Sequence, residues 1–121
     1  IQQYNTNSKI VWVAGFSFGA WVAMQLLMRR PEINGFVCVS PPANMRDFSF
    51  LAPCPSSGLI VHGDKDIIAS YDSSKILSEK LQKQKKVDIL FKTIKGADHF
   101  YENYNEDFSA IVDAYIKDRL T

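Results

Sequence analysis

The sequence has few of the residues that build metal centres and disulfide frameworks: two cysteines and two histidines among 121 residues. Cys38 falls inside an apolar run, and Cys54 lies between two prolines. Neither position fits a disulfide framework or the paired ligand spacing of a zinc site. We therefore expect two reduced, structural cysteines, no bound metal and no cofactor.

The sequence also lacks a large net charge. Its 14 Lys and Arg residues nearly balance its 13 Asp and Glu residues, which leaves a net charge of +1. This argues against nucleic acid or an anionic membrane as a partner. Four lysines do cluster at 80, 83, 85 and 86, but they end a predicted helix, where solvated cations are favourable. There is no apolar run of about 18 residues and no signal-peptide pattern. A cytoplasmic location is the resulting expectation.

What the sequence does contain is an alternation of strand-like and helix-like segments. Short apolar runs predict strands at 9–14, 35–40, 58–62 and 87–94. Helical patterns occupy 18–30, a segment capped by Asp72 or Ser73, and a segment capped by Asn105. Residues 41–57 form a loop, with a turn of helix near 45–50. Residues 1–121 thus predict a single α/β domain, with a mostly parallel sheet covered by helices on both faces.

The most informative segment is Gly15-Phe16-Ser17-Phe18-Gly19, where the first strand passes directly into the first helix. A Gly-x-Ser-x-Gly sequence at such a junction is a nucleophile-elbow signature. The serine is held in a strained turn, and glycines let the strand and the helix approach each other. Ser17 is therefore the candidate nucleophile.

Two further candidates follow the third and fourth strands, namely Asp66 and His99. Ligand sites of open parallel sheets lie outside the carboxyl ends of the strands, so all three side chains are predicted to reach one rim. His99 is then the base that takes the proton of Ser17, and Asp66 orients the imidazole. The backbone N–H of Phe18, at the start of the helix, is placed to stabilise an oxyanion.

Other residues compete for these roles. Asp64 and Asp98 are more typical of turn residues, and His62 of a structural histidine at a strand end. The alternation of His62, Asp64 and Asp66 leaves a metallohydrolase open as a rival, although no second histidine is near them in sequence.

Aromatic residues near these segments could line an acyl pocket or simply pack. They are Phe48, Phe50, Phe100 and Tyr101.

Three motifs carry a family resemblance: Gly15-Phe16-Ser17-Phe18-Gly19, His62-Gly63-Asp64-Lys65-Asp66 and Gly96-Ala97-Asp98-His99-Phe100. Together they resemble the C-terminal half of an alpha/beta-hydrolase-fold protein, of the small lidless esterase-like kind related to dienelactone hydrolases. The resemblance implies a truncated sheet of about four strands, equivalent to strands 5 to 8 of the family. It also implies that the acid is Asp66 rather than Asp64, and that the base is His99.

The elbow follows the first strand here, whereas in the family it follows the fifth. No segment then supplies the second oxyanion donor, and residues 10–13 are expected to lack a neighbouring strand on one side. Because the chain also begins at Ile1 rather than Met, we expect a fragment that forms a homo-oligomer or associates with a missing N-terminal segment.

Two functions remain open from the sequence. One is a serine hydrolase that cleaves a small ester or thioester through an acyl-enzyme, with esterase, thioesterase and peptidase not separated. The other is an inactive hydrolase-fold fragment or binding subunit.

Overall fold

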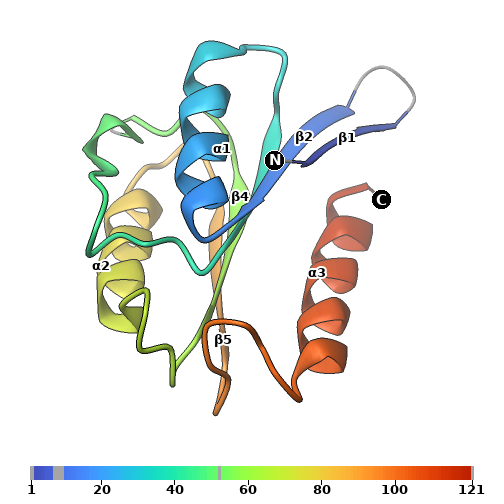
Figure 1. Ribbon diagram of the computed structural model, residues 1–121. Coiled ribbons are helices and arrows are strands. Elements are labelled where there is room, and N and C mark those ends of the chain that lie inside the picture. The colour runs from blue at the N-terminus through green and yellow to red at the C-terminus, as the bar shows by residue number, and fades with distance from the viewer. Residues whose placement is uncertain (1, 7–9, 52, 121) are drawn as a thin grey trace.

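The computed structural model describes residues 2–6, 10–51 and 53–120, which form one mixed sheet flanked by helices (Figure 1). The strands are β1 (Gln2–Thr6), β2 (Ile10–Phe16), β3 (Gly35–Val39), β4 (Gly58–Gly63) and β5 (Ile89–Ile94). The helices are α1 (Phe18–Arg29), the short 3₁₀ helix η1 (Ser49–Leu51), α2 (Tyr71–Gln82) and α3 (Asn105–Leu120). This architecture confirms the α/β prediction.

The sheet runs in the order β1-β2-β3-β4-β5, and β2 to β5 are parallel. Each parallel connection therefore passes over a face of the sheet before returning to the next strand. α1 and α2 cover one face, and α3 lies on the other (Figure 1). All four parallel strands end at the same rim, and the segments that follow them meet there.

One prediction about the sheet is wrong. The strand that precedes the elbow has a neighbour on its outer side, because β1 pairs antiparallel with β2 from Gln2↔Ala14 to Thr6↔Ile10. Residues 2–6 are polar and show no alternation of apolar positions, so their sequence gives no strand signal. Backbone pairing with β2 makes the strand. Lys9, the predicted start of β2, lies outside the described residues.

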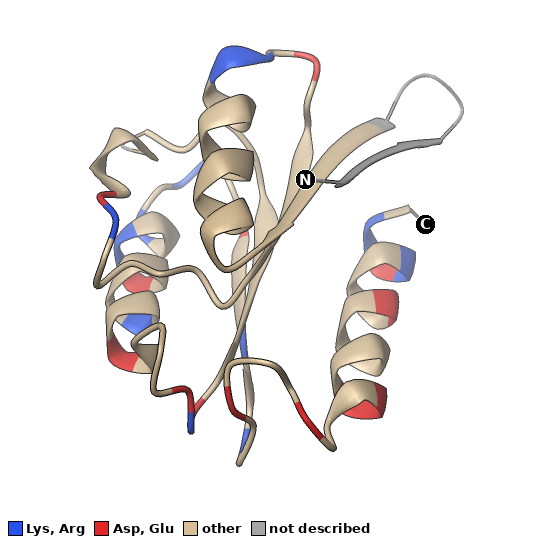
Figure 2. Ribbon diagram, in the orientation of Figure 1, with Lys and Arg blue, Asp and Glu red and all other residues tan. Residues whose placement is uncertain are grey.

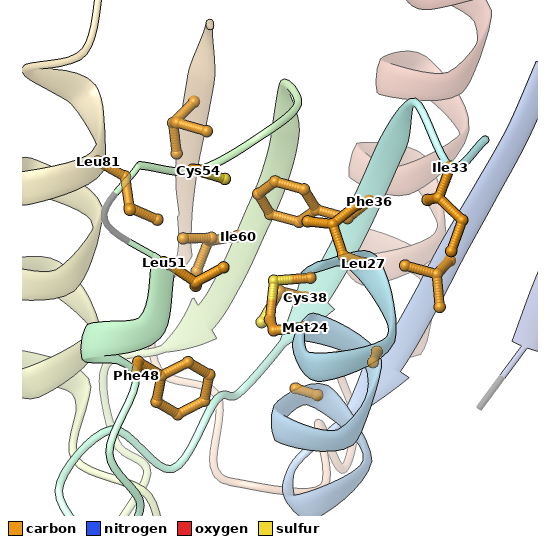
Figure 3. Packing of buried hydrophobic residues seen from close by; sticks show 14 residues of the cluster. Met24, Leu27, Ile33, Phe36, Cys38, Phe48, Leu51, Cys54, Ile60 and Leu81 are labelled. Atoms are coloured by element: carbon orange, nitrogen blue, oxygen red, sulfur yellow. The ribbon is translucent and has the colours of Figure 1, made fainter. Parts of the chain in front are cut away.

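Successive residues of the strands point to opposite faces and build two separate cores. On the side of α1 and α2, Phe36 and Cys38 of β3 pack with Met24 and Leu27 of α1 (Figure 3). On the other side, Val37 and its neighbours meet α3. The buried members of this second cluster are Trp12, Val37, Val39, Leu59, Val61, Ile94, Ala97, Tyr101 and Tyr115.

The observed boundaries differ from the predicted ones by one or two residues at several ends. The N-cap of α2 differs from the prediction. It is Ser70 rather than Asp72 or Ser73, and the Ser70 side chain accepts a hydrogen bond from the Ser73 N–H (3.1 Å). Several Ser and Asp residues in a row satisfy the same capping pattern, so the pattern alone does not select one. The predicted turn of helix in the loop after β3 appears as η1.

Charged side chains lie mainly on α2, α3 and the connecting loops, whereas α1 is uncharged until its last turn (Figure 2). No helix within the described ranges is long and apolar enough to cross a membrane. Cys38 and Cys54 are both buried free thiols, and burial raises the pKa of each. A raised thiol pKa disfavours the reactive thiolate, in keeping with the expected structural role.

Candidate functional site

Ser17 occupies the sharp turn between β2 and α1 in a backbone conformation that non-glycine residues rarely adopt (φ 56°, ψ −123°). Two contacts hold this conformation. The Ser17 N–H donates to the carbonyl oxygen of Val39 on the next strand (2.8 Å), and Gly15 lets the helix approach the strand. A Cβ at Gly15 would overlap the Gly19 carbonyl and lie 2.8 Å from the Ala20 Cα. The hydroxyl of Ser17 remains half-buried at the rim.

Asp66 and His99 reach the same rim from the segments after β4 and β5. His99 Nδ1 lies 2.7 Å from Asp66 Oδ2, and His99 Nε2 lies 2.9 Å from Ser17 Oγ. Asp66 and His99 are both buried, at 9% and 4% exposure. The structure thus brings together the three residues that the sequence singled out, although they are up to 82 positions apart.

The hydrogen-bond acceptors around Asp66, His99 and Ser17 indicate where the protons lie. Asp66 Oδ1 accepts the N–H groups of Ile68 and Ala69, both at 2.8 Å, which fixes the orientation of the carboxylate. Its Oδ2 then accepts the Nδ1–H of His99. The Nε2 of a neutral His99 is left with a lone pair, and the Ser17 hydroxyl donates to it. This is the arrangement in which an imidazole can take a proton from a serine.

The competing aspartates lie in turns. Asp64 Oδ1 accepts the Gly96 N–H at 2.6 Å. Asp98 Oδ1 accepts the N–H groups of Phe100 (3.2 Å) and Glu102 (3.1 Å). Neither of these bonds involves the imidazole of His99. Across the part of the chain that the structure describes, no three His, Cys, Asp or Glu side chains are grouped to hold a metal ion.

His62, at the end of β4, is closer to this group than the sequence indicated. Its side chain is fully buried, and its Nε2 lies 2.9 Å from the Ala69 carbonyl oxygen and 3.1 Å from Asp66 Oδ2. Both neighbours are acceptors, so Nε2 carries the proton. Nδ1 has no hydrogen-bond partner within the described residues, so the expectation of a satisfied structural histidine is met at one nitrogen only. Burial lowers the pKa of His62, and its bonds to Ala69 and Asp66 offset part of that effect.

The lowered pKa of His62 predicts a loss of stability in acid. An unfolded histidine binds a proton below about 6.5, whereas the buried His62 stays neutral there, so protonation favours unfolding as the pH falls from 6.5. A His62→Gln protein should lose less unfolding free energy than the parent below this pH, by up to about 1.4 kcal/mol per pH unit. Urea unfolding at pH 7.5, 6.0 and 5.0 measures the difference. The prediction is contradicted if the unfolding free energy of the two proteins falls equally between pH 7.5 and pH 5.0.

A second buried link joins the His99 loop to β3, and the sequence analysis missed it. The hydroxyls of Ser40 and Tyr101 lie 2.6 Å apart, and both residues adopt positive φ (50° and 56°). Burial raises the pKa of Tyr101 to about 12, so its hydroxyl stays protonated. Ser40 directly follows β3 as Ser17 directly follows β2, and a polar residue directly after a buried strand was the available signal.

The aromatic residues divide between the rim and the core. Phe100, 64% exposed, lies beside His99 with ring centroids 5.1 Å apart. Phe16 contacts the same imidazole, also at 5.1 Å, and its ring centroid lies 6.2 Å from that of Phe100. Phe48 and Phe50 instead stack on each other at the α1–α2 core, and Tyr101 is buried. Of the four aromatics considered from the sequence, Phe100 therefore stands exposed beside the imidazole.

Comparisons with known proteins agree with this geometry. A curated relative, an uncharacterised protein of Rickettsia prowazekii (strain Madrid E), is 50% identical over 120 residues, which cover 96% of this chain and 50% of the relative. A structure from Agrobacterium tumefaciens, of a protein of unknown function described as a candidate alpha/beta hydrolase, is 51% identical. Its TM-score is 0.91, over 94% of this chain and 52% of that one.

A lidless alpha/beta serine hydrolase from Xanthomonas campestris is more distant. It is 26% identical with a TM-score of 0.76, over 88% of this chain and 46% of that one. The chain thus spans about half the length of the relatives it matches. The model of the dienelactone hydrolase family matches residues 1–118. With an elbow serine, a parallel sheet and this match along nearly its whole length, the chain belongs to the dienelactone hydrolase family of alpha/beta hydrolases.

Proposed function

We propose that this chain supplies the catalytic groups of a serine hydrolase that cleaves a small ester or thioester. The observation that carries the proposal is the continuous hydrogen-bonded series from Asp66 through His99 to Ser17, with separations of 2.7 and 2.9 Å. A serine hydroxyl is a weak nucleophile by itself, and this series is what activates it. Membership of a hydrolase family supports the same reaction class.

The reaction proceeds in two halves. In the first, Ser17 Oγ attacks the acyl carbonyl as His99 Nε2 takes its proton, and Asp66 stabilises the imidazolium that forms. His99 then returns the proton to the departing alcohol or thiol, which leaves an ester on Ser17. In the second half, His99 takes a proton from water, the resulting hydroxide attacks the acyl group, and Ser17 recovers its proton as the acid departs.

The charge that develops on the carbonyl oxygen requires hydrogen-bond donors. The N–H groups of the first turn of a helix have no intrahelical partner, and Phe18 is the first residue of α1. Its N–H is the donor that we assign. The Ser17 N–H is excluded from this role because it already donates to Val39. A second donor on another segment would complete the site, as in other hydrolases with this elbow.

Exposed aromatic rings near the elbow and His99 favour an apolar acyl or alcohol group. Phe16, Phe18 and Phe100 are 41%, 50% and 64% exposed, so apolar surface flanks the nucleophile. Burying such rings against an apolar substrate is favourable at about 25 cal/mol per Å².

Covalent labelling with a fluorophosphonate tests the proposal. A single adduct is expected, at Ser17 by peptide mass spectrometry, and Ser17→Ala should remove it. Ser49→Ala, at an exposed serine of η1, is the matched control and should label like the parent. An adduct on another residue, or no adduct at all, would overturn the proposal.

A further inference from the structure

Asp66 is in contact with two imidazoles, and the proposed mechanism uses only one of them. His99 Nδ1 and His62 Nε2 both approach the same oxygen, Oδ2, at 2.7 and 3.1 Å. The other oxygen, Oδ1, accepts two backbone N–H groups from the segment that follows Asp66. The carboxylate therefore accepts three hydrogen bonds and lies in close contact with His62 Nε2, while it is almost completely buried.

The environment of His62 turns an N–H toward Asp66, which lies 3.1 Å from Nε2. The Nε2 of His62 faces the Ala69 carbonyl oxygen and the Asp66 carboxylate, and only an N–H can face two acceptors. Burial favours the neutral ring by lowering its pKa, and the ring of Tyr71 meets it edge to face at 5.9 Å. His62 thus presents a fixed, uncharged donor.

A purely structural role explains this arrangement poorly. The Nδ1 of His62 is buried with no hydrogen-bond partner within the described residues, which costs free energy that an apolar side chain would avoid. The bond to Ala69 alone would hold the turn after β4, but that turn is already held by the two N–H groups on Asp66 Oδ1. The contact that remains to be explained is the one between His62 Nε2 and Asp66 Oδ2.

We propose that His62 is a positioning residue that acts through Asp66. This inference rests on the proposed function, since it concerns the residue that orients His99. The Nε2–H of His62 holds Oδ2 in the plane in which it meets the Nδ1–H of His99. By donating to the same oxygen, it also draws negative charge away from the Asp66–His99 bond. His62 therefore sets both the direction and the strength of that bond.

Two variants separate this role from packing. His62→Phe keeps an aromatic ring and removes both nitrogens, whereas His62→Gln can place an amide N–H near the position of Nε2. The matched control is Ser74→Ala, because Ser74 Oγ is also a buried donor to a carbonyl, that of Pro41, and it does not touch Asp66. All three substitutions should lower the stability, so stability alone does not discriminate.

The first measurement is the proton NMR resonance of the His99 Nδ1–H in ¹⁵N-labelled protein. With two histidines in the chain, the His62 variants contain a single imidazole and need no further assignment. In His62→Phe the resonance should move downfield, because Asp66 Oδ2 then serves one imidazole alone. His62→Gln and Ser74→Ala should leave it near the parent position. An unchanged resonance in His62→Phe would overturn the inference, whether or not the protein is active.

The second measurement is the rate of Ser17 phosphonylation by the fluorophosphonate. We expect about a tenfold fall in His62→Phe, the effect of one hydrogen bond to a charged group, with recovery in His62→Gln. Equal rates in His62→Phe and Ser74→Ala would show that only packing was lost. Absence of labelling in the parent would overturn the proposed function instead, and the NMR result would still stand.

Discussion

Substitution of Asp66 by asparagine is expected to slow Ser17 phosphonylation and ester hydrolysis by about a thousandfold or more. The amide oxygen can replace Oδ1 and keep the N–H bonds of Ile68 and Ala69. The amide nitrogen then faces His99 as a donor, so His99 Nδ1 must become the acceptor and Nε2 must carry the proton. An Nε2–H cannot take the proton of Ser17. Initial rates with p-nitrophenyl acetate, or the phosphonylation rate constant, measure the loss.

Asp64→Asn is the matched control, because the two aspartates lie in the same segment and only Asp66 bonds to His99. Its amide oxygen can still accept the Gly96 N–H, so the rate should stay within about twofold of the parent, as for most surface substitutions. If Asp64→Asn lost as much activity as Asp66→Asn, the assignment of Asp66 as the acid would be wrong. Full activity in Asp66→Asn would exclude the mechanism.

Gly15→Ala is expected to prevent folding or to leave a protein that unfolds at low denaturant. The new Cβ would overlap the Gly19 carbonyl and lie 2.8 Å from the Ala20 Cα, so two backbone segments would have to separate. Forced overpacking of this kind costs about 3 kcal/mol or more when no side chain can yield. A domain of this size has only about 5–15 kcal/mol of stability in total. Urea unfolding by circular dichroism measures the change.

Gly19→Ala tests whether the second glycine of the motif carries the same restriction. A Cβ at Gly19 meets nothing within 4 Å in this structure, and Gly19 lies in the first turn of α1. Alanine is the better helix former, so the stability should be unchanged or should rise by up to about 1 kcal/mol. A loss as large as that of Gly15→Ala would mean that both glycines are needed for packing.

The sequence predicted strands and helices correctly where the hydrophobicity of the side chains reflects their burial. The apolar runs of β3 and β4 are buried on both faces, so hydrophobicity alone located them. The pattern of α3 was equally clear, and Tyr115 and its neighbours do pack on the sheet. β1 was missed because the polar segment Gln2–Thr6 becomes a strand only through its backbone pairing with β2.

The site also contains residues that the sequence predicted and contacts that it did not. Strand ends and chain order were enough to name Ser17, Asp66 and His99 as candidates, and the family resemblance was what preferred Asp66 to Asp64. The contact between His62 and Asp66 was not predictable, because alternation places His62 at the end of β4 but does not say that the following turn folds back onto it. The Ser40–Tyr101 bond spans 61 positions, and the polar residue directly after a buried strand marked Ser40 but not its partner.

By itself, then, the sequence determined the class of fold, the direction of the parallel strands and the rim at which the chemistry must lie. These follow from local patterns: apolar runs, a glycine-bounded serine, and polar residues placed directly after buried strands. Only the tertiary structure decided which atoms meet, since polar contacts of 2.7 to 3.1 Å depend on how three loops pack against one another. For that reason the candidate nucleophile could be named from the chain alone, whereas the second imidazole beside Asp66 could not.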